Sequence, residues 1–219
     1  MILGVRFRWW CLALLLALGA PAFAQTATRP MLLVLGDSLS AEYGLPRDTG
    51  WVKLLADKLA TPGPEGAAQY SVVNASISGE TTSGGRTRLP ALLTQNRPAI
   101  VIIELGGNDG LRGLPLPAMQ ENLAAMVDAS QKSGARVLLV GLRIPPNYGR
   151  DYTDGFANTF AEVARTHKAA LAPFLLDGFA DQTDMFQSDR IHPTAKAQQR
   201  MLDNVWPHLQ PLLAARGKR

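Results

Sequence analysis

Short, continuous apolar runs alternate along this sequence with longer segments whose apolar residues recur at helical spacing. The short runs cover residues 31–35, 70–73, 99–105, 137–142 and 171–176. A run of this length is typical of a strand that is buried on both faces, as in a parallel sheet covered by helices. The pattern therefore predicts five buried strands.

The helical pattern recurs in residues 49–60, 117–132, 156–170 and 195–213. In the second of these segments Met119, Leu123 and Met126 stand at i, i+4 and i+7, and Gly134 follows as a stop signal. Pro207 lies inside the last segment, where a proline should kink or split the helix. Helices are thus expected between the strands and after the last one.

Each connection between the apolar runs is long enough for a crossover between parallel strands. Alternating strands and helices predict an α/β fold, a three-layer α/β/α sandwich with a five-stranded parallel sheet. The sequence has no internal repeat, and its proline- and glycine-rich stretch at 61–66 is typical of a loop. We therefore expect a single domain over residues 25–219.

The first 24 residues have the pattern of a cleaved export signal. Arg6 and Arg8 give a positive start, residues 11–18 are apolar, and Ala22-Phe23-Ala24 matches a signal-peptidase site. The alternative is a membrane anchor, but the apolar run is shorter than the roughly 20 residues that a spanning helix needs. We expect cleavage after Ala24, with no stable membrane anchor after signal cleavage.

Composition narrows the partners and the sources of stability. The net charge of +4 falls to +2 when Arg6 and Arg8 leave, which gives no reason to expect nucleic acid as a partner. Cleavage also removes Cys11, the only cysteine. The exported chain would then have no disulfide, so its core must supply the stability.

Ligands of such a sheet bind beyond the carboxyl ends of its strands. Gly36-Asp37-Ser38 directly follows the first apolar run. The glycine permits a tight turn, and the serine is then a candidate nucleophile at the sheet edge. Taken alone, the motif favours a helix N-cap, in which Asp37 or Ser38 accepts from free backbone N–H groups.

Polar loops at 74–81 and 105–110 follow the next two strands. The Gly79 N–H and the Asn108 amide would be neutral donors beside Ser38. Such donors suit the negative oxygen of a tetrahedral intermediate, and losing one typically costs about 3 kcal/mol of barrier. An ordinary loop turn explains the second loop equally well.

The segment Asp189-Arg190-Ile191-His192-Pro193 precedes the last helix. A hydroxyl nucleophile needs a base such as the His192 imidazole, and Asp189 can fold back onto the other ring nitrogen. His167 and His208 lie in predicted helices, where surface or packing roles are expected. No second cluster of His, Cys or carboxylates has ligand spacing, so no metal site is predicted.

Taken together, these residues resemble the conserved blocks of the SGNH (GDSL) hydrolases, in order and in spacing. The blocks are Gly36-Asp37-Ser38-Leu39-Ser40, Gly79, Gly107-Asn108-Asp109 and Asp189-x-x-His192-Pro193. The stretches 73–79, 89–93, 104–113 and 146–150 are similar to a bacterial group of this family with thioesterase, lysophospholipase and arylesterase activity. The resemblance covers nearly all of the chain after residue 24.

The resemblance implies a flavodoxin-like SGNH fold and a serine esterase without metal or cofactor. Ser38 would be the nucleophile and His192 the general base, oriented by Asp189. The Ser38 N–H, the Gly79 N–H and the Asn108 amide would form the oxyanion hole. Expected substrates are small-molecule acyl esters or lipids, including thioesters, with medium or long acyl chains split through an acyl-enzyme. The resemblance also implies a bacterial protein, periplasmic or extracellular, and we expect a monomer.

Residues 142–150 follow the fourth strand and should overhang the same edge, and the resemblance implies that they line an acyl groove. The substrate-binding residues expected on this basis are Leu111, Arg143, Ile144, Pro145 and Tyr148, and Arg143 or Arg150 could meet a phosphate. A proline-rich connection without ligand contact is the alternative. Glu42, Glu80 and Arg190 depart from the usual pattern, and a carboxylate at Glu42 near the mouth could change the tolerance for anionic substrates such as acyl-CoA.

Two other functions remain open on the sequence. A carbohydrate O-deacetylase uses the same constellation and would act on acetyl esters alone. A non-catalytic lipid- or glycan-binding protein would bind without turnover, although Ser38, Asn108, Asp189 and His192 are all present. Hydrolysis across a range of acyl chain lengths separates these possibilities.

Overall fold

The computed structural model describes residues 29–61 and 70–214. This part of the chain contains a five-stranded sheet of order β2-β1-β3-β4-β5, in which every neighbouring pair is parallel. The strands are β1 (Met31–Gly36), β2 (Ser71–Asn74), β3 (Ile100–Glu104), β4 (Arg136–Val140) and β5 (Ala170–Ala172). The predicted five-stranded parallel sheet is confirmed.

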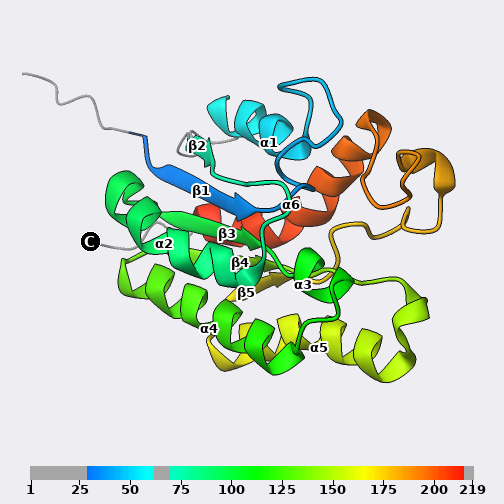
Figure 1. The fold of residues 1–219 in the computed structure, drawn as a ribbon. Coiled ribbons are helices and arrows are strands. Elements are labelled where there is room, and N and C mark those ends of the chain that lie inside the picture. The colour runs from blue at the N-terminus through cyan, green and yellow to red at the C-terminus, as the bar shows by residue number, and fades with distance from the viewer. Residues whose placement is uncertain (1–28, 62–69, 215–219) are drawn as a thin grey trace, which may run out of the picture.

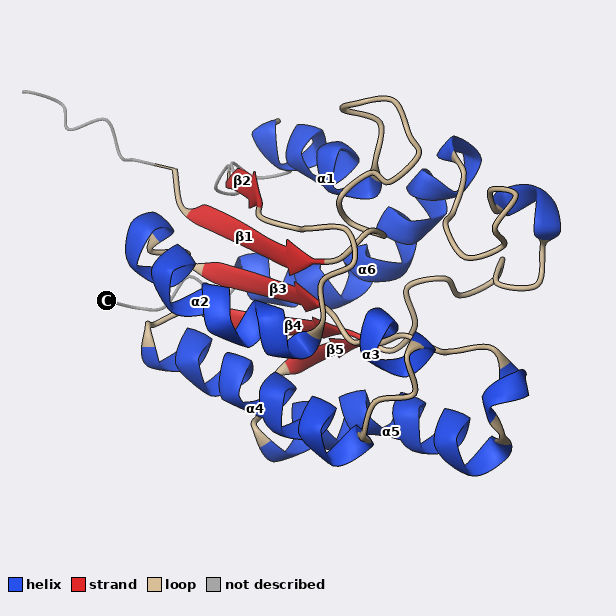
Figure 2. Ribbon diagram, viewed as in Figure 1, coloured by secondary structure: helices blue, strands red, loops and turns tan. Residues whose placement is uncertain are grey.

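Helices cover both faces of the sheet (Figures 1 and 2). They are α1 (Trp51–Ala60), α2 (Thr82–Asn96), α3 (Gly107–Leu111), α4 (Leu116–Lys132), α5 (Arg150–Thr166) and α6 (Gln198–Ala214). Single 3-10 turns are η2 (Pro146–Tyr148), η3 (Thr183–Met185) and η4 (Ala195–Ala197). Helices α2, α4 and α5 pack in a row on one face, and α1 packs against α6 on the other. The three-layer α/β/α sandwich is thus also confirmed.

The burial of the middle strands explains why their sequences are continuous apolar runs. β3 is buried at every residue, and β1 and β4 are buried at all but their first residue. Strand β2, at the sheet edge, is only partly buried. Because helices cover both faces of the sheet, the side chains on neither face of a central strand meet water, so apolar residues are favoured along the whole strand.

Helix α2 was not among the helices that apolar spacing predicts. Its sequence contains Gly84, Gly85 and Pro90. Its large apolar residues, Leu89, Leu92 and Leu93, are confined to the second half of the helix. Two features support it: the Thr81 hydroxyl accepts from the Gly84 N–H at its start, and Gly85 packs directly on the core. A Cβ at Gly85 would lie 2.3 Å from Leu105 Cδ1, so the helix approaches the sheet closely because a side chain is missing there.

Three predicted elements differ in detail in the structure. The last helix runs without a split through Pro207 and Pro211, because its apolar face is buried from Met201 to Leu209 and stabilises it through packing. The run at 171–176 is a strand only as far as Ala172, since Pro173 has no N–H to continue the ladder. Helix α5 already begins at Arg150, well before the predicted residue 156.

The proposed signal segment, residues 1–24, lies outside the described residues. Within the described ranges, no helix has the length and apolar character that crossing a bilayer requires. The single domain over 25–219 stays a prediction for the same reason, although its described part shares one continuous hydrophobic core.

Candidate active site

Strand β1 ends in a turn that carries Ser38 to the carboxyl edge of the sheet. The N–H groups of Ser40 and Ala41 both donate to the Asp37 carbonyl, at 3.2 and 2.9 Å. Gly36 is needed here, because a Cβ would lie 2.8 Å from the side chains of Ser40 and Glu104. Asp37 does cap this turn, through a 3.0 Å bond from the Leu39 N–H, whereas the Ser38 side chain points elsewhere.

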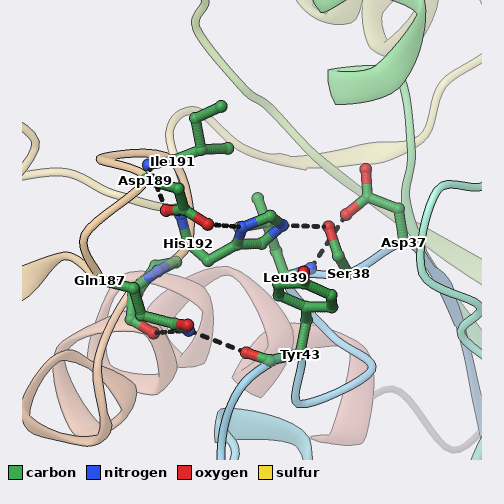
Figure 3. Close-up of polar contacts among 9 residues, drawn as sticks. Asp37, Ser38, Leu39, Tyr43, Gln187, Asp189, Ile191 and His192 are labelled. Carbon is green, nitrogen blue, oxygen red and sulfur yellow. Dashed lines mark hydrogen bonds and ion pairs between the residues drawn. The ribbon is translucent and has the colours of Figure 1, made fainter.

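Ser38 meets His192, which lies 154 residues further along the chain in the connection from β5 to α6 (Figure 3). His192 Nε2 lies 2.9 Å from Ser38 Oγ, and His192 Nδ1 lies 2.7 Å from Asp189 Oδ2. The three predicted catalytic residues therefore form one continuous hydrogen-bonded chain. Its geometry is that of a nucleophile, a base and a carboxylate that orients the base.

Asp189 is held by the backbone of its own loop as well as by the imidazole. Its Oδ1 accepts from the N–H groups of Ile191 and His192, at 2.9 and 3.0 Å. Burial acts to raise the pKa of Asp189, but these bonds and the bond to the His192 ring outweigh it and lower the pKa to about 2. The carboxylate is therefore ionised wherever the imidazole can act as a base.

Two residues that sequence reasoning missed hold His192 in place. The Tyr43 ring packs against the His192 ring, with centroids 4.3 Å apart. Gln187 Nε2 donates to the Tyr43 carbonyl at 2.8 Å, and the Gln187 N–H donates to the His192 carbonyl at 2.8 Å (Figure 3). Tyr43 and Gln187, 144 positions apart, thus join the loop of His192 to the loop of Ser38, and no local pattern marks either residue.

The predicted oxyanion donors follow β1, β2 and β3 at the same edge of the sheet, and Asn108 lines the same cavity as Ser38. Gly79 has φ +81°, a left-handed conformation that glycine adopts freely, and its carbonyl accepts from Arg112 Nη2 at 3.1 Å. Within residues 29–61 and 70–214, neither the Ser38 N–H nor the Gly79 N–H has a hydrogen-bond acceptor. Asn108 Nδ2 donates one hydrogen to Asp37 Oδ2 at 3.2 Å, which leaves its second amide hydrogen for a ligand.

An apolar cavity of about 570 Å³ opens beside the Ser38–His192 pair. Its walls come from the connections that follow β1, β3, β4 and β5, all at the carboxyl edge. The apolar lining residues include Leu39, Leu111, Leu142, Ile144, Pro145, Pro146, Phe174, Leu176, Ala180, Phe186 and Ile191. The cavity lies within the size range of small-molecule sites, and its lining suits a hydrocarbon chain.

Of the five predicted substrate-binding residues, Leu111, Arg143, Ile144 and Pro145 line this cavity. Tyr148 is not among the lining residues. Its hydroxyl instead donates to the Leu111 carbonyl at 2.7 Å, so it supports the wall from behind.

Known proteins are similar to this chain in sequence and in fold. A profile of the GDSL-like lipase/acylhydrolase family matches residues 34–200. The chain belongs to this family. It is 52% identical over 203 residues to Esterase TesA of Pseudomonas aeruginosa, covering 93% of this chain and 96% of that protein. It is 39% identical over 207 residues to Thioesterase 1/protease 1/lysophospholipase L1 of Escherichia coli strain K12, covering 94% and 95%.

A solved relative has the same fold. The crystal structure of the psychrotrophic esterase EstA from Pseudoalteromonas sp., inhibited by monoethylphosphonate, superposes with a TM-score of 0.77 at 43% sequence identity. The match covers 84% of this chain and 98% of that one. As a member of this family with esterase relatives along nearly its full length, the chain is a hydrolase that acts on ester bonds.

Two departures from the usual family pattern have structural explanations. The Glu42 carboxylate accepts from the N–H groups of Gly50 and Asp48, at 2.6 and 3.0 Å, and Glu42 is not among the residues that line the cavity. The Glu42 carboxylate thus closes its own loop, and its effect on anionic substrates stays a prediction. Glu80 forms an ion pair with Arg88 at 2.6 Å. Arg190 lines the cavity beside His192 and has φ +57°.

The other two histidines lie away from Ser38. His167 lies at the end of α5, with its Nδ1 2.7 Å from Asp128 Oδ1 of α4. His208 lies within α6. Across the described ranges no cluster of three or more His, Cys, Asp or Glu residues could hold a metal ion.

Proposed function

We propose that this protein is a serine esterase that cleaves carboxylic esters and thioesters of medium and long acyl chains. The observation that carries the proposal is the chain from Asp189 through His192 to Ser38, which ends at an apolar cavity. The roles of the individual residues are part of this proposal.

The geometry supports a two-step reaction. His192 Nε2 takes the proton of Ser38 Oγ as that oxygen forms a bond to the acyl carbonyl carbon, and the carbonyl electrons move to the oxygen. Asp189 stabilises the imidazolium that results. The N–H groups of Ser38 and Gly79 and the Asn108 amide donate to the oxyanion.

Collapse of this intermediate expels the leaving group. The bond from the acyl carbon to the leaving oxygen or sulfur breaks, and His192 gives its proton to the departing alcohol or thiol. Water then attacks the acyl-enzyme, with His192 again as base, and Ser38 leaves with the proton as the free acid forms. Each step needs only groups of this chain and water.

The cavity supports acyl chains longer than acetyl. An acetyl group has a single methyl to bury, whereas this cavity presents at least ten apolar side chains over about 570 Å³. Each buried CH₂ contributes about 0.8 kcal/mol, so binding should improve as the chain lengthens. We include aryl esters, acyl-CoA thioesters and lysophospholipids as substrates of this cavity, and place the O-deacetylase reading second.

Residues 1–24 support export with cleavage after Ala24, to the periplasm or beyond. In that location lipid esters would be closer at hand than cytosolic acyl-CoA. We expect the mature protein to act as a monomer, which sedimentation equilibrium would test.

Hydrolysis of p-nitrophenyl esters, from acetate to palmitate, tests the function. We expect activity that rises toward medium or long chains and that Ser38→Ala abolishes. Activity on acetate alone would point to the deacetylase. If turnover is absent or does not depend on Ser38, while lipid binding is retained, the protein is a non-catalytic binding protein instead.

A further inference from the structure

Glu104 is a fully buried carboxyl directly beneath the nucleophile turn, and none of the chemical steps above uses it. It is the last residue of β3 and pairs in register with Gly36 at the end of β1. Glu104 Oε2 accepts from Ser40 Oγ at 2.7 Å and lies 3.4 Å from the Asp37 N. These contacts fix Asp37, directly before Ser38, and Ser40, two residues after it.

A second carboxyl lies in the same buried space. Asp37 is only 2% exposed, and its Oδ1 and Oδ2 accept from the Leu39 N–H and from Asn108 Nδ2. Gly107 leaves room for it, since a Cβ there would lie 3.1 Å from Asp37 Oδ2. In the part of the chain that the structure describes, no Lys or Arg pairs with either carboxyl.

Two carboxylates without a cation cannot both keep a full charge in such a place. Every hydrogen bond to Asp37 comes from an N–H donor, which suits an anion. Glu104 Oε1, in contrast, has no partner among the described residues, and an unpartnered oxygen costs less on a neutral acid than on a carboxylate. The environments of the two carboxyls therefore differ in which charge state they favour.

The electrostatics agree with this division. Burial and the Asp37 charge raise the pKa of Glu104 well above its usual range. Burial raises the pKa of Asp37 only to about 6, because the Leu39 and Asn108 hydrogen bonds and the nearby His192 lower it. Asp109 also faces Asp37 and raises its pKa slightly. One proton held by the pair at neutral pH belongs on Glu104.

We propose that Glu104 is a positioning residue that acts as a neutral carboxylic acid. It holds the Ser38 turn through Ser40 and the Asp37 N–H. Because it stays uncharged, Asp37 remains the single anion of the pair. Asp37 in turn holds one amide hydrogen of Asn108, which aims the other at the oxyanion. This inference rests on the esterase function proposed above.

The test compares two substitutions at one position. Glu104→Gln keeps the shape and an acceptor for Ser40 without a charge, whereas Glu104→Leu removes the acceptor. We expect kcat of Glu104→Gln within about twofold of the wild type and kcat of Glu104→Leu lower by about tenfold or more, with KM nearly constant in both. The pH profile of Glu104→Gln should overlay that of the wild type.

Other results would overturn the proposal. If Glu104→Gln loses kcat as Glu104→Leu does, or changes the acid limb of the pH profile, Glu104 acts as an anion. If Glu104→Leu keeps full kcat, the residue positions nothing. Should Glu104→Leu not fold, Ser40→Ala breaks the same hydrogen bond from the other side and should also lower kcat at constant KM; full kcat in Ser40→Ala would count against the proposal.

A spectroscopic readout separates this inference from the esterase function. Infrared spectra of the wild type at neutral pH should contain the C=O stretch of a buried protonated carboxyl, and Glu104→Gln should lack it. A wild type without that band refutes the neutral Glu104 even if the enzyme is active. A band without esterase activity would refute the proposed function and leave the protonation of Glu104 standing.

Discussion

At the scale of single residues, the site depends on charge states that burial and hydrogen bonds impose. Asp189 is the more exposed of the carboxylates at the site and has its pKa lowered to about 2, while Asp37 and Glu104 are buried and have theirs raised. The difference follows from the partners: Asp189 accepts three hydrogen bonds, from two N–H groups and the imidazole. A carboxyl group thus serves as an anion at Asp189 and retains its proton at Glu104.

Asp189→Asn should lower kcat severely with little change in KM. The amide would favour the wrong imidazole tautomer and could not stabilise the imidazolium, and in a serine protease the corresponding change costs about 10⁴ in kcat. Steady-state kinetics on a p-nitrophenyl ester measure this. Asp184→Asn, on the neighbouring η3 turn, is the matched control and should behave as the wild type. A loss of only a few-fold would mean that Asp189 merely packs against the ring.

Glu104→Gln should gain stability relative to the wild type as the pH rises. In the unfolded chain Glu104 ionises near its ordinary pKa of about 4.5, whereas the folded protein keeps the proton to higher pH. Above that pH, ionisation of Glu104 therefore stabilises the unfolded wild type but not the folded one. The free energy of unfolding falls until the folded pKa is passed. The glutamine has no such proton.

Urea unfolding of both proteins across the acid-to-neutral range measures this difference. Below the ordinary pKa of a glutamate the gap between the two free energies of unfolding should be constant. A gap that stays constant at every pH would show that the folded and unfolded carboxyls titrate alike, against the structure.

At the scale of elements, helix α2 shows how packing creates a helix where apolar spacing is weak. Its start is tied to α3, since Thr82 donates to the Asp109 carboxylate through both its N–H, at 2.8 Å, and its hydroxyl, at 2.6 Å. That link sets the Gly79 loop beside Asn108. The element therefore positions the proposed oxyanion donors as well as covering the sheet.

Gly85→Ala should destabilise the protein although alanine favours helices. The new Cβ would lie 2.3 Å from Leu105 Cδ1, and overpacking of this kind typically costs about 1–3 kcal/mol. Thermal or urea unfolding measures the change. Ser83→Ala, exposed on the same helix, is the control and should shift stability little. Unchanged or higher stability of Gly85→Ala would mean that α2 can move away from the sheet at no cost.

At the scale of the whole molecule, the parallel sheet gathers the site from distant segments. All strands point the same way, so the connections after β1, β3, β4 and β5 meet at one edge and enclose the cavity. The chain-length preference is therefore a property of several loops together. A change in one wall should alter it without altering the chemistry.

Ile144→Trp should shorten the preferred acyl chain. Ile144 lines the cavity and is 8% exposed, so a larger side chain there takes space from the substrate. At about 0.8 kcal/mol per CH₂, excluding two methylenes lowers kcat/KM for long esters by roughly tenfold, while acetate hydrolysis stays near the wild type. A p-nitrophenyl ester series measures it, with Gln95→Trp, at an exposed position of α2 outside the lining, as a control. An unchanged profile would place the acyl chain elsewhere.

Much of the fold and of the site was determined by the sequence alone. Continuous apolar runs determine buried strands, because only a strand covered on both faces has no polar side, and their alternation with helices determines a parallel sheet. The candidate triad could also be found, since Ser38 directly follows a strand and Asp189 and His192 stand three residues apart. The position of Ser38 after a strand predicts the carboxyl edge of the sheet, whereas Asp189 and His192 lie well beyond the end of β5 and are recognised by their spacing alone.

Contacts between segments that are far apart in the chain arise only in the folded molecule. The buried pair Glu104 and Asp37 has no local signal in the sequence, since Ser40, which bonds to Glu104, lies 64 residues away from it. The contact between Gln187 and Tyr43 has no local signal either. Sequence periodicity reports which face of an element is buried, but it does not report what lies opposite. Burial and opposing partners set the charge of a carboxyl and the shape of a cavity, so these properties emerge only when the layers have packed.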